Sequence, residues 1–484
     1  MAANVNVPIS WETATGDDLT MLNELQPNIV RAHVRDSLSI LFLQFANQAD
    51  ARAFLVSLVP LMKSALTHLI EVKRFKTLGI RGTPYVGVGL SKKGYDALGV
   101  GAIPLDSSFR RGMKDPATRQ DLADPPVSLW EAPYRHDIHA VVLIGDRNDA
   151  AMATRREEVV ALLPDSVTVI GEESGFSLRN DNDDGIEHFG YVDGRSQPLF
   201  LVEDIDDERD GSDGTNVWDP AFALDRVLVP DPAAPNPGVH FGSYLIFRKL
   251  EQNVRRFKQG EQDLADALGL IGDDRERAGA MLVGRFEDGA PLTLQKDGAP
   301  LTLQRDEGSH HPVMNNFTYD RDLQGAKCPF QAHIRKINPR GSGGFKIPAD
   351  ERLHLMARRG QTYGKRLDDP NDDSIPPAAR PTGGVGILFM AFNANINIQD
   401  NFALSQFDFT QRAWANNSNF PRVPVGVSPP GLDPVIGQGA RPDQTYVNDW
   451  AGSSGTQVTA IAQAVHMRGG EYFFVPCLAF LRNL

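Results

Sequence analysis

A strand-like segment followed by an amphipathic helix occurs twice in this chain of 484 residues. The first copy is LSILFLQF (38–45) followed by ANQADARAFLVSLVPLMKSALTHL, in which apolar residues recur at spacings of three and four. The second copy is SYLIFRKLEQNVRRFKQGEQDLADAL at 243–268. Because a chain of this length exceeds the size at which a single core stops growing, the repeated order predicts two similar halves.

The segment between the two copies is rich in acidic residues and proline. It includes LVEDIDDERDGSDGTNVWDPAF (201–222) and VPDPAAPNPGVHFG (229–242), whose composition breaks regular structure. We therefore place the boundary near residue 235, which gives an N-terminal half at 20–235 and a C-terminal half at 236–484.

Further strand-like runs, IHAVVLIGD and SVTVIGEESGF, alternate with helical segments. The long loops between them do not follow the tight strand-helix repeat of a parallel sheet. This pattern favours an α+β fold with antiparallel sheets.

Composition excludes several classes of partner. The formal net charge of −13 is the wrong sign for binding a polyanion, so no nucleic-acid partner is expected. The longest apolar runs fall short of the roughly 20 residues that span a bilayer, and the N-terminus lacks the pattern of a secretory signal. Cys328 and Cys477 are too few for a disulfide framework. These features predict a cytoplasmic protein without a membrane partner.

Three short motifs contain residues suited to chemistry. In EHFGYVDGRSQP (187–198), Gly190 and Gly194 bracket Asp193, a pattern that by itself is typical of a turn. In CPFQAHIRKINPR (328–340), His333 lies among cations, where a single histidine is more often a surface or hydrogen-bonding residue than a ligand.

The third motif, RLHLMARRGQTYG (352–364), has the adjacent arginines Arg358 and Arg359, a pattern usual on a solvated edge. The sequence also offers His310 and His311, in SHHPVMNN, as alternative metal ligands.

Taken together and in this order, GYVDG, AHIRKINPR and MARRGQTYG resemble the dye-decolourising peroxidases, a family of haem enzymes, and above all its larger members. LQPNIVRAHVRD, VGRFEDGAPL, GILFMAFNANINIQDNFALSQ and RGGEYFFVPCLAFL agree with that family, so the resemblance extends from about residue 25 to the C-terminus. It implies two ferredoxin-like α+β halves with antiparallel sheets and peripheral helices, in a dimeric α+β barrel-like fold. The haem is then expected in the C-terminal half.

The resemblance also implies roles for particular residues. His333 matches the proximal ligand of the iron in haem b, Asp193 the distal acid-base residue and Arg358 the distal arginine. We expect Gly194, Arg335 and Arg359 to contact the haem as well, and Arg359 replaces Arg358 if the register slips by one residue.

One departure from the family concerns the partner of the proximal imidazole. Where the family often has an acidic residue, the segment FNANINIQ offers Asn395. A neutral amide makes the imidazole a weaker electron donor than a carboxylate does.

The implied activity is that of a peroxidase. It reduces hydrogen peroxide to water through a ferryl haem and oxidises dyes, phenols or other aromatic reductants. The alternatives are a haem-holding protein for iron handling and a haem-free ferredoxin-like binding module. Electrons could also pass through surface aromatic residues, although core packing is the more usual role of each tryptophan: Trp11, Trp130, Trp218, Trp414 and Trp450. The motifs do not specify the oligomeric state.

Overall fold

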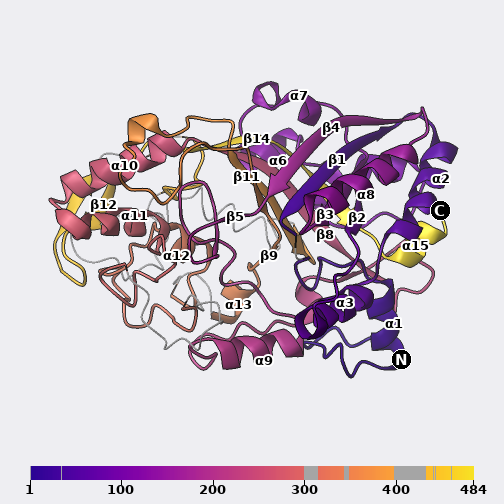
Figure 1. Cartoon of the computed structure of the whole chain (residues 1–484), viewed down its shortest axis with the longest axis horizontal. Coiled ribbons are helices and arrows are strands. Elements are labelled where there is room, and N and C mark those ends of the chain that lie inside the picture. Colours follow the sequence, from indigo (N-terminus) through magenta and orange to yellow (C-terminus); the bar gives the residue numbers. More distant parts are fainter. Residues whose placement is uncertain are drawn as a thin grey trace.

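The computed structural model describes residues 2–33, 35–298, 314–342, 348–396, 432–439, 441, 443–458 and 461–484. A ten-stranded sheet runs through them in the order β7-β8-β14-β2-β3-β1-β4-β10-β11-β9. An additional pairing of β8 with β11 closes this sheet into a barrel. In Figure 1, most helices of the N-terminal half lie on the right and α10 to α12 of the C-terminal half on the left, while α15 and the C-terminus return to the right.

Each half contributes four strands in the same spatial order. Numbered along the chain within each half, both sets lie in the order 4-1-3-2, and their ladders are antiparallel. The N-terminal strands are β1 (Ser37–Phe45), β2 (Tyr85–Leu90), β3 (Ala140–Asp146) and β4 (Val167–Phe176), and the C-terminal strands are β8 (Phe241–Gln252), β10 (Gln361–Tyr363), β11 (Gly386–Asn393) and β14 (Val465–Val475). The expected pair of ferredoxin-like halves is thus confirmed.

Shorter strands extend or flank the barrel: β5 (Leu178–Arg179), β6 (Gly185–Ile186), β7 (Val229–Pro230), β9 (Ala357–Arg358), β12 (Gln444–Val447) and β13 (Gly455–Val458). The helices of the N-terminal half are α1 (Gly16–Glu24), α2 (Gln48–Leu58), α3 (Ala65–Leu78), α4 (Lys92–Ala97), α5 (Ser107–Arg111), α6 (Pro116–Asp121), α7 (Ala132–Arg135), α8 (Asp149–Ala161) and α9 (Val202–Gly211). Those of the C-terminal half are α10 (Val254–Ala267), α11 (Glu276–Val283), α12 (His333–Ile337), α13 (Pro348–Arg352) and α15 (Leu478–Arg482).

Local sequence explains where the first helix of each half begins. After β1, the side chain of Asn47 accepts the N–H of Asp50 and caps α2. After β8, the side chain of Asn253 accepts the N–H of Arg256 and caps α10 in the same way. An asparagine that follows a buried strand therefore starts the covering helix in both halves.

The two halves share one core. Phe42 on β1 packs edge-on against Phe247 on β8, with ring centroids 5.0 Å apart. The ladders β4–β10 and β2–β14 also join strands of different halves. The predicted boundary at 235/236 falls between β7 and β8, and it stays a prediction because the sheet crosses it without interruption.

One apolar stretch, Gln48–Leu78, is long enough by composition to cross a membrane. In the structure this stretch is not one straight helix, because α2 ends at Leu58 and α3 begins at Ala65. A 3₁₀ turn (Val59–Leu61) lies between them, and Ser64 caps α3 by accepting the N–H of Thr67. The break favours a pair of covering helices over a single span.

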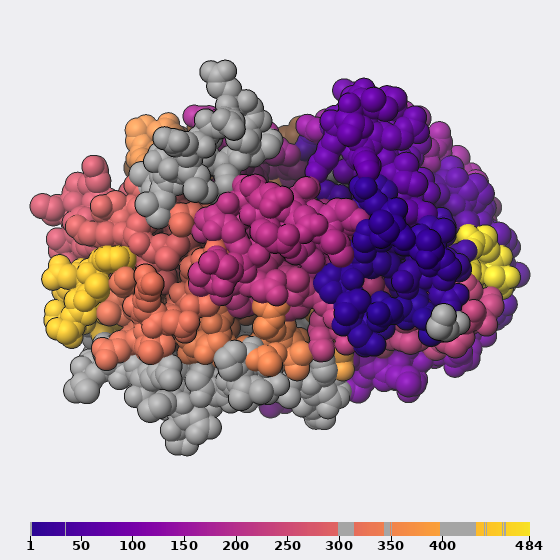
Figure 2. Space-filling view, turned by 90° about the horizontal axis from the view of Figure 1, so that it is seen from below, coloured from indigo at the N-terminus to yellow at the C-terminus, as the bar shows by residue number. Residues whose placement is uncertain are grey.

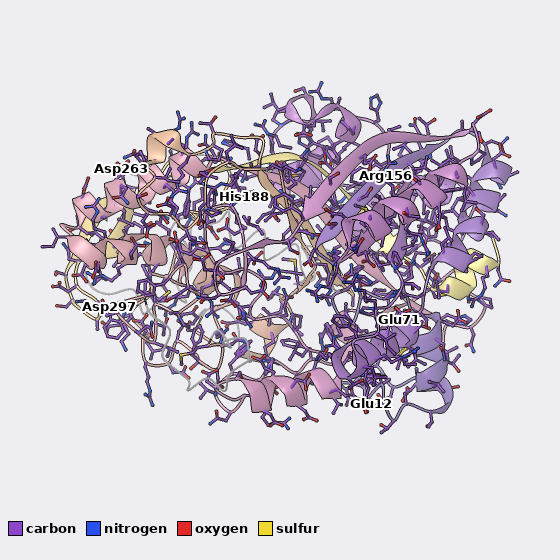
Figure 3. All side chains as sticks on the ribbon, viewed as in Figure 1. Glu12, Glu71, Arg156, His188, Asp263 and Asp297 are labelled. Atoms are coloured by element: carbon purple, nitrogen blue, oxygen red, sulfur yellow. The ribbon has the colours of Figure 1, made fainter. Side chains whose placement is uncertain are left out.

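Seen from below, the segment that contains α9 fills the surface between the two halves (Figure 2). His188 lies near the middle of the molecule, between Asp263 on α10 and Arg156 on α8 (Figure 3). The segment that bears the GYVDG motif follows directly after His188 in the sequence.

Candidate active site

A mostly apolar cavity brings the three sequence motifs together. Its wall includes the GYVDG loop, the end of β8, β11 and the helix that begins at His333. Val435 and Ile436 add apolar surface from a loop near the C-terminus. Of the predicted residues, this cavity is lined by His333, Asp193, Gly194 and Arg358.

The imidazole of His333 is held by a buried carboxylate. Its Nδ1 lies 2.8 Å from Oδ2 of Asp433, whose side chain is 0% exposed. The other oxygen of Asp433 accepts the N–H groups of Val435 (2.8 Å) and Ile436 (3.1 Å). Burial opposes ionisation of Asp433, but His333 and the N–H of Ile436 outweigh it and lower its pKa. An ionised acceptor at Nδ1 fixes the tautomer in which Nε2 is free to bind a metal.

The prediction that a neutral amide is the partner of the imidazole is therefore wrong. The residue that accepts the Nδ1 proton is Asp433, not Asn395. Asp433 follows His333 by 100 residues and lies beyond the FNANINIQ segment, so no short spacing connects the two in the sequence. This chain has the acidic partner that is typical of the resembled family.

Asp193 lies on a turn that only glycines can form. Gly190 has φ +103°, and a Cβ there would lie 3.1 Å from Nδ2 of Asn371 and 3.2 Å from the carboxylate of Glu287. Gly194 has φ +82°, and its N–H lies 2.6 Å from Oδ1 of Asp193. Both conformations lie in the left-handed region that glycine adopts without a steric cost. The turn presents the carboxylate of Asp193 to the cavity.

The guanidinium of Arg358 faces that carboxylate. Its Nη1 lies 3.4 Å from Oδ1 of Asp193, and its Nη2 donates to the carbonyl of Arg195 at 2.5 Å. The main-chain N–H of Arg358 donates to the side chain of Gln197 at 3.0 Å. A carboxylate that handles protons and a fixed positive charge thus lie side by side in one cavity with an imidazole.

Glu187 supports the same turn from within. Its two oxygens accept the N–H groups of Phe189 (2.8 Å) and Tyr191 (3.1 Å), and the amide of Gln252 on β8 also donates to it. Burial raises the pKa of Glu187 to about 7, against these hydrogen bonds. The side chain therefore connects the loop of Asp193 to the barrel.

Two predicted haem contacts do not line the cavity. Arg335 is 0% exposed, donates to Asp322 and to the carbonyl of Cys328, and packs over the rings of Tyr319 and Phe330. The physical reason is helical periodicity, because a residue two positions after His333 lies on the other side of the helix. The predicted contact of Arg335 is corrected to a structural role.

The haem contact predicted for Arg359 is not supported either, because Arg359 does not line the cavity. Successive side chains of a strand point to opposite faces, so Arg359 turns away from the cavity that Arg358 enters. It is 5% exposed, and among the described residues its guanidinium donates to the main-chain carbonyls of Asn28, Ile29 and Arg358. Of the two arginines, Arg358 is the one that lines the cavity, and its role as the distal arginine stays a prediction.

Sequence reasoning missed three polar residues that line the cavity. Arg285 is 4% exposed, and its Nη2 has no hydrogen-bond partner among the described residues; the same holds for Nδ2 of Asn338. Burial lowers the pKa of Arg285 to about 10 and that of Arg340 to about 9. A porphyrin has two carboxylates, and the free donors of Arg285 and Asn338 beside an apolar wall fit them. Arg340, whose Nη groups already donate to Asn315, Phe317 and Ser196, adds positive charge to the same wall. Asn338 and Arg340 belong to the INPR end of the histidine motif, which was the available signal.

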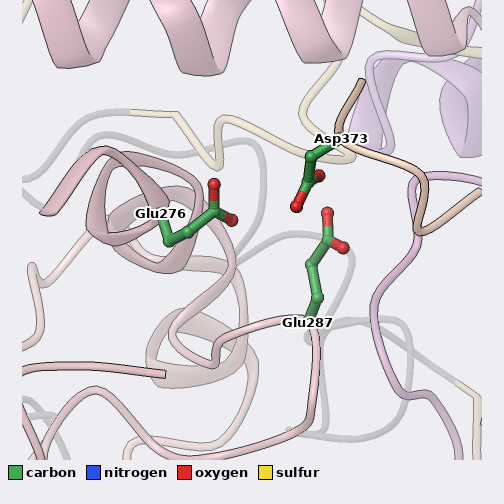
Figure 4. Close-up of side chains that lie close together, drawn as sticks. All are labelled: Glu276, Glu287 and Asp373. Atoms are coloured by element: carbon green, nitrogen blue, oxygen red, sulfur yellow. The ribbon is translucent and has the colours of Figure 1, made fainter. Parts of the chain in front are cut away.

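A cluster of three carboxylates lies outside the cavity lining. The side chains of Glu276, Glu287 and Asp373 have oxygens within 4.8 Å of one another (Figure 4). Lys258 pairs with Glu287 and supplies a balancing charge. Exposed acidic groups of this kind are common without an ion, and we assign no metal to them.

The remaining candidates are two histidines and the five tryptophans, and of these the four tryptophans that the structure describes do not line the cavity. His310, His311 and Trp414 lie outside the described residues. Trp11, Trp130 and Trp218 are buried, and Trp450 donates its indole N–H to the carbonyl of Leu292. Packing accounts for these four positions.

Comparison with known proteins agrees with this geometry. The model of the DyP dimeric alpha+beta barrel domain matches residues 24–178. The multifunctional dye peroxidase DyP2 of Amycolatopsis sp. is 60% identical over 485 residues, which cover 100% of both chains. Peroxidase 2 of Mycetinis scorodonius is 30% identical over 91% of this chain and 83% of its own.

Solved structures show the same likeness along the whole chain. The structure of DyP2 from Amycolatopsis sp. superimposes with a TM-score of 0.92 at 59% identity, covering 100% of both chains. A DyP-type peroxidase of Anabaena sp. superimposes with a TM-score of 0.85 at 35% identity, covering 98% of this chain and 96% of that one. With matches of this identity and coverage, the chain belongs to the dye-decolourising, or DyP-type, peroxidases.

Proposed function

We propose that the cavity binds haem b and that His333 is its axial ligand. The observation that carries the proposal is an imidazole fixed at Nδ1 by a buried aspartate, in one cavity with the Asp193–Arg358 pair. When bound, the haem supplies the oxidising equivalents that peroxide leaves behind and passes them to reducing substrates. Arg285, Asn338 and Arg340 are the residues suited to hold its carboxylates.

Asp193 moves the proton that peroxide cleavage requires. Hydrogen peroxide must lose a proton from one oxygen and gain a proton on the other before the second oxygen leaves as water. A carboxylate on a rigid glycine-flanked turn can accept the first proton and deliver it to the second oxygen, directly or through one water. The hydrogen bonds of Glu187 to the same loop hold that carboxylate in place.

Arg358 stabilises the charge that develops on the departing oxygen. Its guanidinium is oriented by Asp193, by the carbonyl of Arg195 and by the packing of β9 against β11. A preorganised cation next to the developing charge typically stabilises it by a few kcal/mol.

The reducing substrates are proposed to be dyes, phenols and other aromatic compounds. A solved dye-decolourising peroxidase has been captured in complex with 2,6-dimethoxyphenol, at 26% identity to this chain. The paired Asp193 and Arg358 favour an enzyme over a protein that merely holds haem, since storage needs neither group.

The roles are tested with haem-reconstituted protein and its Asp193→Asn and Arg358→Leu variants. Peroxide-dependent bleaching of an anthraquinone dye is measured for each, with Asp181→Asn as a control in an exposed part of the same segment. Each site variant is expected to lose about 100-fold or more in the peroxide-dependent rate constant, while the control retains the parental rate. Unchanged turnover in Asp193→Asn would rule out its proton-transfer role.

A further inference from the structure

Two buried arginines tie the start of the barrel to the strand that carries Arg358. Arg359 donates through Nε to the carbonyl of Asn28 (2.7 Å) and through Nη2 to that of Ile29 (2.9 Å). Its third nitrogen, Nη1, donates to the carbonyl of Arg358 at 2.8 Å. Arg35 donates to the carbonyl of Arg359 at 2.6 Å. Both arginines therefore act on the main chain at Arg358 and Arg359.

The other contacts of Arg35 belong to the same N-terminal segment. Its Nη1 lies 3.3 Å from the side-chain oxygen of Asn28 and 3.0 Å from the carbonyl of His33. Asn28 has φ +75°, a left-handed conformation that asparagine tolerates better than most residues. This conformation turns the segment so that its carbonyls meet the two guanidinium groups. It lies in the LQPNIVRAHVRD motif, for which the catalytic roles give no reason.

The arrangement carries an energetic cost. Arg35 and Arg359 are 9% and 5% exposed, and among the described residues their guanidinium groups donate to neutral acceptors, the side-chain oxygen of Asn28 and main-chain carbonyls. Burial and, as the next largest cause, the nearby charge of Arg35 lower the pKa of Arg359 to about 9. Buried charges without a counter-ion are poor sources of stability. We therefore take the role of the two arginines to be fixing the main-chain geometry at Arg358 and Arg359.

Arg358 needs support of this kind because its own strand is short. β9 has only two residues, which pair with Ala391 and Phe392 on β11. Beyond Arg358 the chain is held by the N–H of Arg359, which donates to the carbonyl of Met390 at 2.7 Å. Without the guanidinium contacts, the carbonyls of Arg358 and Arg359 would lose the hydrogen bonds that fix the peptide planes next to the catalytic side chain.

We propose that Arg359 and Arg35 are positioning residues of the peroxide-activating pair: they hold the main chain at Arg358 so that its guanidinium meets the carboxylate of Asp193. The proposal rests on the proposed function of Arg358. It also assigns a purpose to the N-terminal segment 28–35, which helps to set the catalytic geometry of the C-terminal half through main-chain carbonyls.

Cyanide binding to the haem-reconstituted protein provides a readout other than turnover. Hydrogen cyanide must give up a proton, which Asp193 can accept, and the bound anion is stabilised by a nearby guanidinium. The affinity is measured from the shift of the Soret band for Arg358→Lys, Arg359→Lys and the double variant. Arg52→Lys is the matched control, because Arg52 also donates to main-chain carbonyls, those of Leu98 and Gly99, away from the cavity lining.

Arg359→Lys is expected to bind haem normally but to weaken cyanide binding by about 10- to 100-fold, the range expected when a catalytic group is displaced by up to 1 Å. Because Arg359 acts through Arg358, the double variant should bind cyanide no more weakly than Arg358→Lys alone. Arg52→Lys should leave cyanide affinity unchanged even if it lowers the unfolding temperature.

Two results would overturn the proposal: parental cyanide affinity in Arg359→Lys, or losses that multiply in the double variant. If Arg359→Lys does not fold, Arg35→Lys provides the test, since it keeps every donor of Arg359 and removes the contact to the carbonyl of Arg359 together with the contacts of Arg35 to Asn28 and His33. That variant should weaken cyanide binding, and parental affinity would count against the proposal. If Arg358→Lys itself binds cyanide as the parent does, the proposed function fails first and the positioning role fails with it.

Discussion

Replacing Asp433 by asparagine tests the support of the proximal imidazole with almost no change in shape. One oxygen of Asp433 accepts two main-chain N–H groups and the other accepts the proton on Nδ1 of His333. An amide cannot do both. Either its NH₂ group faces Nδ1–H at 2.8 Å, or the amide flips and opposes the N–H groups of Val435 and Ile436.

Each arrangement leaves buried donors unsatisfied, at a cost of about 1–3 kcal/mol. If the imidazole instead changes tautomer to relieve the clash, the proton moves to Nε2, and that nitrogen can no longer bind iron. Loss of such a supporting group typically weakens metal affinity by about 10- to 100-fold, which corresponds to about 1.4 to 2.8 kcal/mol.

The assay titrates apoprotein with haemin and follows the Soret band, with a competing haem acceptor to bring the affinity into range. Asp231→Asn is the matched control, because Asp231 is also 0% exposed and accepts two main-chain N–H groups, from Ala233 and Cys477, away from the cavity lining. If Asp433→Asn bound haem no more weakly than this control, the reasoning about the proximal partner would be refuted.

Three further variants separate structural from functional roles. Arg335→Met leaves Asp322 as an unpaired buried carboxylate and should lower the free energy of unfolding by about 3–5 kcal/mol, as measured by urea denaturation. The folded variant should still bind haem, and loss of the Soret band with unchanged stability would contradict this. Arg285→Met should weaken the binding of haem but not of its dimethyl ester, whose carboxylates are neutral; equal losses for both would argue against a carboxylate contact. Glu187 has a pKa raised to about 7 by burial, so its contribution to stability is complete below its unfolded pKa and is lost as the pH rises through about 7. Urea midpoints should therefore fall more for the parent than for Glu187→Gln between about pH 5 and pH 8, and parallel curves would show that Glu187 does not titrate there.

Much of the fold could be predicted because its signals are local. The order of strand and helix in each half depends on periodicity and on asparagine caps such as Asn47 and Asn253, which lie within a few residues of what they control. Closure of the sheet into a barrel could not be predicted from such local signals. It depends on the pairing of β8 with β11 and of β2 with β14, which lie far apart along the chain.

The same distinction applies to the site. Asp193, His333 and Arg358 lie in compact motifs, and the structure brings them to one cavity. Asp433 was missed because it lies 100 positions after His333 and meets it only in the folded chain. Arg335 was misplaced although the signal was present, since an offset of two residues on a helix already directs it away from His333.

The binding of haem through His333 is tested most directly by the absorption spectrum of haem-reconstituted protein beside that of His333→Ala. The parent should show a Soret band at one haem per chain, and the variant should lose the spectrum of the imidazole-ligated iron and regain it when free imidazole is added. A variant whose spectrum and haem affinity match those of the parent would show that another group holds the iron.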